Sequence, residues 1–278
     1  MGTLLGPNEG VLMSERVTVN IKDGVADVRL NRPEKLNALD NAMFRAIVDA
    51  GENLKRRSEV RAVVLSGEGR SFCAGLDFSS FQAMGTDEKD NQNEESEDHL
   101  EGRITHLGQQ AAWVWQELEV PVIGAISGHA LGGGFQIAMG PDIRIVHPDT
   151  KMSVLEIRWG LVPDMGASVL LPPVVGLDVA KEMYFTGKMI SGAEAVELGV
   201  ATRVSDDPHG SAMELAGEIA GKNPEAVRRM KTILNGLPER STAERFAAER
   251  EHIGALIGSP NQKEAVTSFF EKRAPNFE

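Results

Sequence analysis

The stretch SGHALGGGFQIAMGPD, residues 127–142, places three consecutive glycines between an apolar run typical of a strand and an apolar run typical of a helix. Glycine costs backbone entropy on folding, so a triplet is kept where the backbone must approach another group closely or adopt a conformation that other residues avoid. Gly132, Gly133 and Gly134 therefore predict a tight strand-to-helix turn. The residues alone leave two interpretations, which are close packing or backbone N–H groups presented to a ligand.

Strands and helices alternate on both sides of this turn. Residues 15–31, ERVTVNIKDGVADVRLN, predict a hairpin closed by Asp23-Gly24. The stretch after Asp40, an expected N-cap, has the apolar spacing of a helix. Short β-branched runs predict buried strands at residues 61–67, 120–128 and 142–148. This alternation predicts an α/β fold.

The composition changes after Gly187, where successive amphipathic helices follow one another, one of them starting at Ser259-Pro260. A chain of 278 residues can hold one elaborated domain with an appendage. Surplus apolar helix faces are expected to pack between subunits. We expect a flexible N-terminal extension, an α/β core and a C-terminal helical oligomerisation region at residues 1–14, 15–200 and 201–278.

Charge and composition exclude several classes of protein. The net charge of −12 argues against nonspecific binding of nucleic acid. No apolar run reaches the ~18 residues that a membrane span needs. The single cysteine, Cys73, allows no intramolecular disulfide and fits a reducing cytoplasm, where we expect the protein to act. The sequence has neither an HExxH nor a CxxC pattern, so we expect no metal site.

Residues 85–101, GTDEKDNQNEESEDHLE, hold eight acidic residues against one lysine. Such a composition is typical of a solvated loop, because it offers too little apolar surface to offset the cost of ordering. A flap that orders over a bound substrate is the alternative.

The sequence does not match two common functional motifs, the dinucleotide-binding fingerprint and the nucleophilic serine elbow. Gly67-x-Gly69 is followed by Phe72 where a dinucleotide fingerprint needs a third glycine, and no serine lies in a GxSxG elbow. What remains are two glycine-containing turns after strands, CAGLD (73–77) and LGGGF (131–135). Two backbone N–H groups that converge on one point form an oxyanion hole, which stabilises the enolate of a thioester.

Six stretches carry a resemblance in consecutive order: RPEKLNALD (32–40), GRSFCAGLD (69–77), PVIGAISGHALGGGFQIAMGPDIRI (121–145), MSVLEIRWGLVPDMGASVLLPPVVG (152–176), TGKMISGAEAVELGVATRV (186–204) and FFEKRAPNF (269–277). Together they resemble the enoyl-CoA hydratase/isomerase (crotonase) superfamily over about residues 15–278. The resemblance implies a ββα spiral core, a helical trimerisation region, and homotrimers or hexamers (dimers of trimers) that bind acyl-CoA thioesters. It implies no separate cofactor, because the substrate carries coenzyme A.

The resemblance also assigns site residues. It places the two oxyanion-hole N–H groups on Leu76 and Gly133. It places the coenzyme A contacts on the stretch EKLNAL and on the carbonyl of the loop after Cys73, which gives Lys35, Leu36, Ala38 and Ala74.

The acidic positions depart from the hydratase pattern. Hydratases of the superfamily place one glutamate after the glycine triplet and a second in the stretch that resembles LEIRWG; here the second is Glu156 and the first is Gln136. A glutamine can orient a water but cannot take its proton. Asp164 lies where the dienoyl-CoA isomerase branch has an aspartate, although that branch's remaining acid again falls on Gln136.

Two simpler interpretations stand beside these roles. Glu156 could form an ion pair with Arg158 or Lys151, and Asp164 could cap a helix near Gly166.

The resemblance and the residues together predict an acyl-CoA enzyme of fatty-acid or lipid catabolism that moves a double bond. Glu156 would remove and return the proton, with Asp164 as its electrostatic partner. Enoyl-CoA hydratase is the alternative within the same class. An acyl-CoA binding protein whose catalysis has lapsed with the loss of an acid at Gln136 is the alternative outside it.

Overall fold

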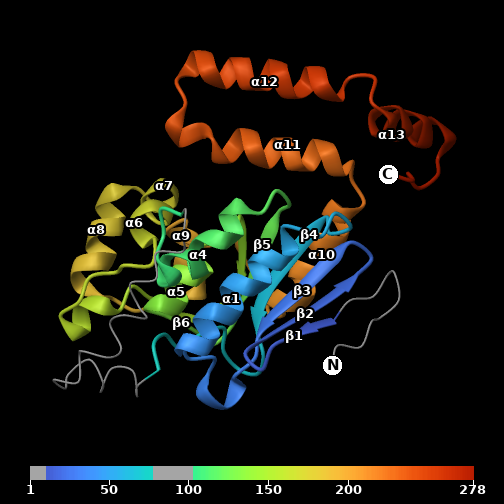
Figure 1. The fold of residues 1–278 in the computed structure, drawn as a ribbon. Coiled ribbons are helices and arrows are strands. Elements are labelled where there is room, and N and C mark those ends of the chain that lie inside the picture. Colours follow the sequence, from blue (N-terminus) through green and yellow to red (C-terminus); the bar gives the residue numbers. More distant parts are fainter. Residues whose placement is uncertain (1–10, 78–102) are drawn as a thin grey trace.

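The structure is a computed structural model that describes residues 11–77 and 103–278 (Figure 1). The acidic stretch 85–101 lies outside the described residues. A seven-stranded sheet in the order β1-β2-β3-β4-β5-β7-β10 forms the centre, and β6, β8 and β9 form a second, three-stranded sheet. The predicted α/β fold class is confirmed by this arrangement of sheets and helices.

The strands of the large sheet include every strand that the sequence predicts. Lys22 pairs with Val25 across a turn in which Asp23 and Gly24 have positive φ angles of 51° and 78°, which suits the expected hairpin. The first three strands are antiparallel and the others are parallel. Their bounds are β1 (Val11–Met13), β2 (Val17–Lys22), β3 (Val25–Leu30), β4 (Ala62–Gly67), β5 (Val122–Ile126), β7 (Ile143–Val146) and β10 (Arg203–Val204).

The strand β1 corrects part of the predicted N-terminal extension, residues 1–14. Val11 to Met13 pair with β2 in antiparallel register, Val11 opposite Asn20. The physical reason is that β2 has a free edge, which a short run of apolar residues can cover by backbone hydrogen bonds. Residues 1–10 lie outside the described part of the chain.

The large sheet is covered on both faces (Figure 1). Along β4, Val63 and Leu65 belong to the cluster beneath α1 (Asn41–Leu54) and α4 (Leu107–Glu117). Ala62 and Val64 point the other way and pack under α10 (Pro208–Ala220). This alternation explains why the sequence of β4 is apolar throughout, since both faces of a parallel sheet are buried.

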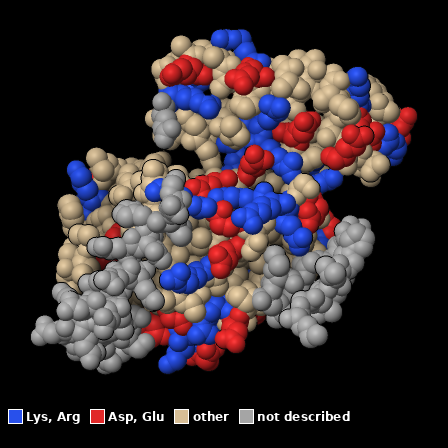
Figure 2. Space-filling model, viewed as in Figure 1, with Lys and Arg blue, Asp and Glu red and all other residues tan. Residues whose placement is uncertain are grey.

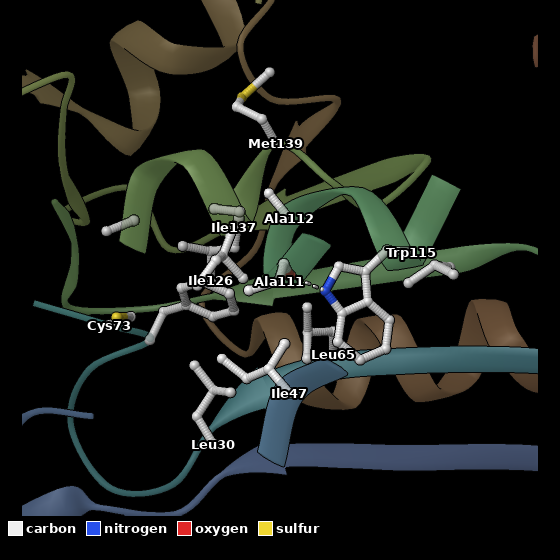
Figure 3. Packing of buried hydrophobic residues seen from close by; sticks show 14 of the residues in the cluster. Leu30, Ile47, Leu65, Cys73, Ala111, Ala112, Trp115, Ile126, Ile137 and Met139 are labelled. Carbon is white, nitrogen blue, oxygen red and sulfur yellow. Dashed lines mark hydrogen bonds between the residues drawn. The ribbon is translucent and has the colours of Figure 1, made fainter. Parts of the chain in front are cut away.

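The larger cluster holds the side chains that fix the α1 and α4 face (Figure 3). Trp115 is fully buried there, and its indole Nε1 donates to the carbonyl oxygen of Ala111 at 3.0 Å. The predicted N-cap Asp40 accepts from the N–H of Met43 at 2.7 Å, which starts α1 where the sequence indicates.

The second sheet brings the glycine turn and the LEIRWG stretch together. Its strands are β6 (His129–Leu131), β8 (Lys151–Ser153) and β9 (Ile190–Ser191), and β6 and β8 run parallel. After β6 the chain enters α5 (Gly133–Ala138), and after β8 it enters the 3-10 helix η3 (Glu156–Trp159). Parallel neighbours end at the same edge, so both segments start from one place.

The C-terminal part is helical, as predicted. Ser259 caps α13 by accepting from the N–H of Gln262 at 3.2 Å. β10 and α10 follow residue 200 in the sequence yet pack with the large sheet, whereas α11 and α12 extend away from it (Figure 1). The remaining helices are η1 (Pro33–Lys35), α6 (Ala167–Leu170), α7 (Pro172–Val175), α8 (Leu177–Thr186), α9 (Gly192–Glu197), α11 (Pro224–Asn235), η4 (Leu237–Glu239), α12 (Thr242–Leu256) and α13 (Pro260–Glu271).

A buried ammonium ties α11 to the core. Lys231 donates to the carbonyl oxygens of Trp115 and Val120 at 3.1 and 3.0 Å and pairs with Asp142 at 2.8 Å. Burial lowers the pKa of Lys231, and the Asp142 carboxylate opposes that shift. Helix α11 is therefore fixed to the core by a charge that could not stay buried without these partners.

Apolar side chains remain exposed on two parts of the surface. Uncharged surface predominates over α7 and α8 and covers much of the arm formed by α11, α12 and α13 (Figure 2). Exposed side chains on the arm are Met230, Leu234, Phe246, Ile253, Val266, Phe269 and Phe270. Among the described residues, no helix combines the length and the apolar character that crossing a membrane requires.

Candidate active site

The glycine triplet forms the predicted tight turn, and each of its members has its own reason. Gly132 has φ 53° and ψ −121°, a conformation that a side chain disfavours. A Cβ on Gly134 would overlap the carbonyl oxygen of Cys73 and lie 2.8 Å from its Sγ, and a Cβ on Gly133 would lie 2.9 Å from the Sδ of Met165. The triplet thus serves close packing at two positions and backbone conformation at the third.

Two backbone N–H groups beside the turn donate to no other described residue. Leu39 pairs with the loop through Gly75 and Asp77, which directs the N–H of Leu76 to the opposite side. Gly133 is the first residue of α5, where an N–H has no partner within the helix. A Cβ on Gly75 would lie 4.0 Å from the nitrogen of Gly133, so the two loops are in contact. This geometry suits the expected oxyanion hole, whose role stays a prediction.

The residues expected to contact coenzyme A lie on one turn and the loop beside it. Leu36 has a positive φ of 52°, and its carbonyl oxygen accepts from the N–H of Ala74 at 3.0 Å. Lys35 is exposed, and Ala38 is buried. The structure therefore brings Leu36 and Ala74 together and leaves the Lys35 side chain at the surface.

A buried asparagine organises this turn and was missed in the sequence. Asn37, fully buried, donates to the carbonyl oxygens of Glu68 and Ser71 at 3.0 and 2.8 Å and accepts from the N–H of Arg32 at 2.7 Å. Its φ of 56° is one that asparagine tolerates better than most residues. The sequence signal for this role is an asparagine between apolar residues. If such an asparagine is buried, its amide needs several hydrogen-bond partners and so organises the backbone around it.

Gln136 and Glu156 form a hydrogen-bonded pair. The Nε2 of Gln136 donates to the Oε1 of Glu156 at 2.6 Å. The Oε1 of Gln136 accepts from the N–H groups of Met165 and Ala167 at 2.8 and 3.3 Å, which fixes the orientation of the amide. The glutamine that replaces the first acid therefore orients the second one.

The Glu156 carboxyl has a free oxygen and a raised pKa. Its Oε2 is buried without a hydrogen-bond partner. Burial raises the pKa of Glu156 above 4.5, and the Asp164 carboxylate adds to this; the Gln136 amide and nearby backbone N–H groups oppose the shift. In the described part of the chain, Glu156 forms no ion pair with Lys151 or Arg158, so the salt-bridge interpretation is wrong.

Asp164 acts on Glu156 by charge rather than by contact. Its side chain is exposed. The N-cap residue of α6 is Gly166, with a φ of 97°, and no side chain caps this helix, so the helix-cap interpretation of Asp164 is wrong. Its carboxylate raises the pKa of Glu156. Its role as electrostatic partner in a reaction stays a prediction.

Tyr184 is a second residue that sequence reasoning missed. It lies on α8, which packs against η3, and its Oη is buried without a hydrogen-bond partner. Burial and the Glu156 carboxylate raise the pKa of Tyr184 to about 12. In the sequence it resembles an ordinary core residue of an amphipathic helix. The one signal that distinguishes it is that it is the only tyrosine of the chain.

A separate cavity of about 220 Å³ lies on the α10 side of the large sheet. It is lined by Arg29, Ser66, Glu68 and His209 among others, and by none of the predicted site residues. Within residues 11–77 and 103–278, no three His, Cys, Asp or Glu side chains come together as possible ligands of a metal ion.

Comparisons with known proteins agree on one family. Its sequence profile, described as enoyl-CoA hydratase/isomerase, matches residues 20–278. A short-chain-enoyl-CoA hydratase of Clostridium acetobutylicum is 35% identical over 91% of this chain and 94% of its own. A peroxisomal Δ(3,5)-Δ(2,4)-dienoyl-CoA isomerase of Arabidopsis thaliana is 31% identical over 95% of this chain and 96% of its own.

The solved structures agree with the sequence comparisons. An enoyl-CoA hydratase of Mycobacterium tuberculosis superposes with a TM-score of 0.82 at 28% identity, covering 95% of this chain and 99% of its own. This likeness confirms the predicted crotonase-like fold. The family profile spans the glycine turn, the Gln136–Glu156 pair and the C-terminal helices alike. The chain therefore belongs to the enoyl-CoA hydratase/isomerase family.

Proposed function

We propose that the protein moves a carbon–carbon double bond in an acyl-CoA thioester, with Glu156 as the group that takes and returns the proton. The observation that carries this proposal is the Gln136–Glu156 pair. One carboxylate with a raised pKa and one free buried oxygen suffices for proton shuttling, whereas the amide opposite it cannot accept a proton.

The chemistry follows from the polar groups around Glu156. The thioester oxygen accepts hydrogen bonds from the N–H groups of Leu76 and Gly133. The Oε2 of Glu156 removes a proton from the α-carbon of a 3-enoyl thioester, and the electrons pass into a dienolate held by those two donors. Glu156 then returns the proton to the γ-carbon, which leaves the double bond between the α- and β-carbons. No atom is gained or lost, and Glu156 ends as it began.

The rest of the substrate needs its own contacts. In this proposal the coenzyme A part is held by Lys35, Leu36, Ala38 and Ala74. Because the substrate itself carries coenzyme A, the proposed reaction uses no separate cofactor. The reaction belongs to the breakdown of fatty acids or other lipids. The exposed apolar side chains of α11 to α13 support assembly into a homotrimer or hexamer. Light scattering at micromolar concentration tests the assembly, and a monomer would contradict it.

Hydration of a 2-enoyl thioester is the second candidate. The names of relatives favour it, since the 35% identical protein of Clostridium acetobutylicum is a hydratase. The loss of a carboxylate at Gln136 argues against it, because a hydratase of this family uses two acids on one water. An acyl-CoA binding protein without activity is the third outcome of the same experiment.

A panel of 2-enoyl-, 3-enoyl- and 3,5-dienoyl-CoA separates these candidates. We expect turnover of a 3-enoyl or 3,5-dienoyl substrate and a loss of about 10²- to 10⁴-fold in kcat for Glu156→Gln. Acyl-CoA affinity should stay within a few-fold, because binding rests mainly on other groups.

Glu117→Gln is the matched control. The Glu117 carboxylate also accepts from a glutamine amide, Gln110 Nε2 at 2.7 Å, but lies on α4 away from the predicted site residues. Turnover should survive this change. If Glu156→Gln keeps wild-type turnover, Glu156 is not the base; if no substrate is turned over although acyl-CoA binds, the protein is a binding protein.

A further inference from the structure

The Tyr184 hydroxyl has no function in the proton shuttle just described. Its Oη is buried without a hydrogen-bond partner, and the Oε2 of Glu156 shares that condition. Proteins pair nearly all buried polar atoms, so an unpaired hydroxyl on the helix that packs against the Glu156 segment points to a hydrogen-bond partner outside the chain. The Oε2 of Glu156 is accounted for by the proton that it must exchange. The hydroxyl of Tyr184 is not.

Tyr184 is held on the helix that packs against the segment carrying the proposed base. Its helix α8 packs against η3, the segment that begins with Glu156. Two neighbours on α8, Ala180 and Met183, are fully buried in the main cluster, and they fix the side of the helix from which the phenol projects. The ring itself packs against the same cluster. The hydroxyl therefore has a defined place on the helix that covers the Glu156 segment.

The protonation state decides what Tyr184 can bind. Its pKa of about 12, raised by burial and by the Glu156 carboxylate, keeps the phenol protonated at physiological pH. A phenol that keeps its proton can donate a hydrogen bond to an oxygen. The nearby carboxylate of Glu156 repels a second anion, so a neutral oxygen suits the place better than a carboxylate.

We propose that Tyr184 donates a hydrogen bond to a neutral oxygen on the acyl chain, so that the substrate is a hydroxy- or keto-acyl-CoA rather than a plain hydrocarbon acyl-CoA. A hydrocarbon chain that packs against Tyr184 would leave the hydroxyl buried and unpaired, as it is in the free protein, and would gain no hydrogen bond from it. A chain with an oxygen at this point pairs it. Sites built to bind a substrate hydroxyl discriminate strongly against the analogue that lacks it.

This inference rests on the proposed function for its location but is tested without turnover. Calorimetry compares hexanoyl-CoA with 4-hydroxyhexanoyl-CoA and 5-hydroxyhexanoyl-CoA, whose hydroxyls lie beyond the reacting carbons and differ only in position. We expect the wild-type protein to bind at least one hydroxylated thioester about tenfold or more tighter than hexanoyl-CoA. Tyr184→Phe should abolish that preference and leave the affinity for hexanoyl-CoA unchanged or higher.

Thr186→Val is the matched control, because it also removes one hydroxyl from α8. That hydroxyl is exposed and bonds the carbonyl oxygen of Glu182 within the helix at 2.7 Å. The preference should survive in Thr186→Val. The melting temperature of Tyr184→Phe should match or exceed that of the wild type, since the lost hydroxyl is buried without a partner in the protein.

Three results overturn the inference. Equal affinity of the wild type for all three thioesters means that the Tyr184 hydroxyl forms no hydrogen bond with the acyl chain. An equal loss for all three in Tyr184→Phe means that the residue only supports the fold. A preference that persists in Tyr184→Phe assigns the oxygen to another group. Failure of the isomerase proposal shows separately, as full turnover in Glu156→Gln.

Discussion

The two sides of the candidate site are built by different means. On one side, the site is lined by the backbone of residues 73–77 and 132–134. A Cβ added to Gly75, Gly133 or Gly134 would lie within 3 Å of a neighbouring atom, so no side chain fits at these positions. On the other side, Glu156 and Tyr184 present side chains with unpaired buried oxygens. The segment after Glu156 also leaves Trp159, Leu161 and Val162 exposed.

This difference separates the part of the site that packing constrains from the part whose side chains can be exchanged. Backbone donors keep their place only if the packing around them stays intact, so a change there is paid in stability before it affects chemistry. Side chains on the other side are held by a few hydrogen bonds and can be exchanged with little effect on the fold. Reaction type and substrate choice should therefore depend on Gln136, Glu156, Asp164 and Tyr184.

The largest effect is expected on the backbone side. Gly134→Ala places a Cβ against the carbonyl oxygen and Sγ of Cys73, which are both buried and cannot move away cheaply. The free energy of unfolding should fall by about 3 kcal/mol. Gly217→Ala on α10, where no neighbouring atom lies within 4 Å, should instead raise it by up to ~1 kcal/mol. Urea denaturation measures both, and an unchanged midpoint for Gly134→Ala would contradict the comparison.

The second effect is on reaction choice. Gln136→Glu puts a carboxyl where an amide now lies 2.6 Å from Glu156, and supplies the missing acid for a water. Hydration of a short 2-enoyl-CoA should rise about 10²-fold. Gln110→Glu, which also sets a buried carboxyl against a glutamate, is the control outside the site. If Gln136→Glu folds, binds acyl-CoA and gains no hydration at any pH, position 136 does not separate this protein from a hydratase.

The smallest effect concerns pH. Because the pKa of Glu156 is raised above 4.5, the base is protonated and inactive at low pH, and kcat/KM should rise as pH increases through that raised value. Asp164→Asn removes a charge that contributes to the shift, so the rise should move to lower pH. Gln136→Glu should move it to higher pH, since a new like charge disfavours ionisation. A pH profile that Asp164→Asn leaves in place would remove Asp164 from the set of groups acting on Glu156.

Much of the fold follows from local patterns in the sequence. The Asp23-Gly24 turn, the Asp40 cap and the apolar strands each depend on neighbours in the chain, and all lie where they were expected. The strands β6, β8 and β9 were not predicted, because two or three residues carry no period. β1 was missed for the same reason, since it exists only by pairing with β2.

The site was predictable only as far as backbone motifs reach. The glycine turn and Glu156 could be found from their sequence context. The orientation of Gln136 could not, since it depends on the N–H groups of Met165 and Ala167, about 30 residues further along the chain. Tyr184 was missed because the burial of its hydroxyl depends on the packing of α8 in the folded protein, which no local pattern encodes.

The C-terminal arm is attached to the sheet at both of its ends. Lys231 binds carbonyl oxygens at the end of α4, and near the other end the carbonyl oxygen of Phe277 accepts from the guanidinium of Arg61 at 3.1 Å. The same guanidinium also donates to the carbonyl oxygen of Ala220 on α10 at 3.3 Å. Arg228 on α11 adds further hydrogen bonds, because its guanidinium donates to the carbonyl oxygens of Ser58 and Val60 at 3.1 and 3.3 Å. A force applied to α12 is therefore transmitted to the body of the protein near both ends of the arm, and releasing the arm requires the contacts at both ends to break.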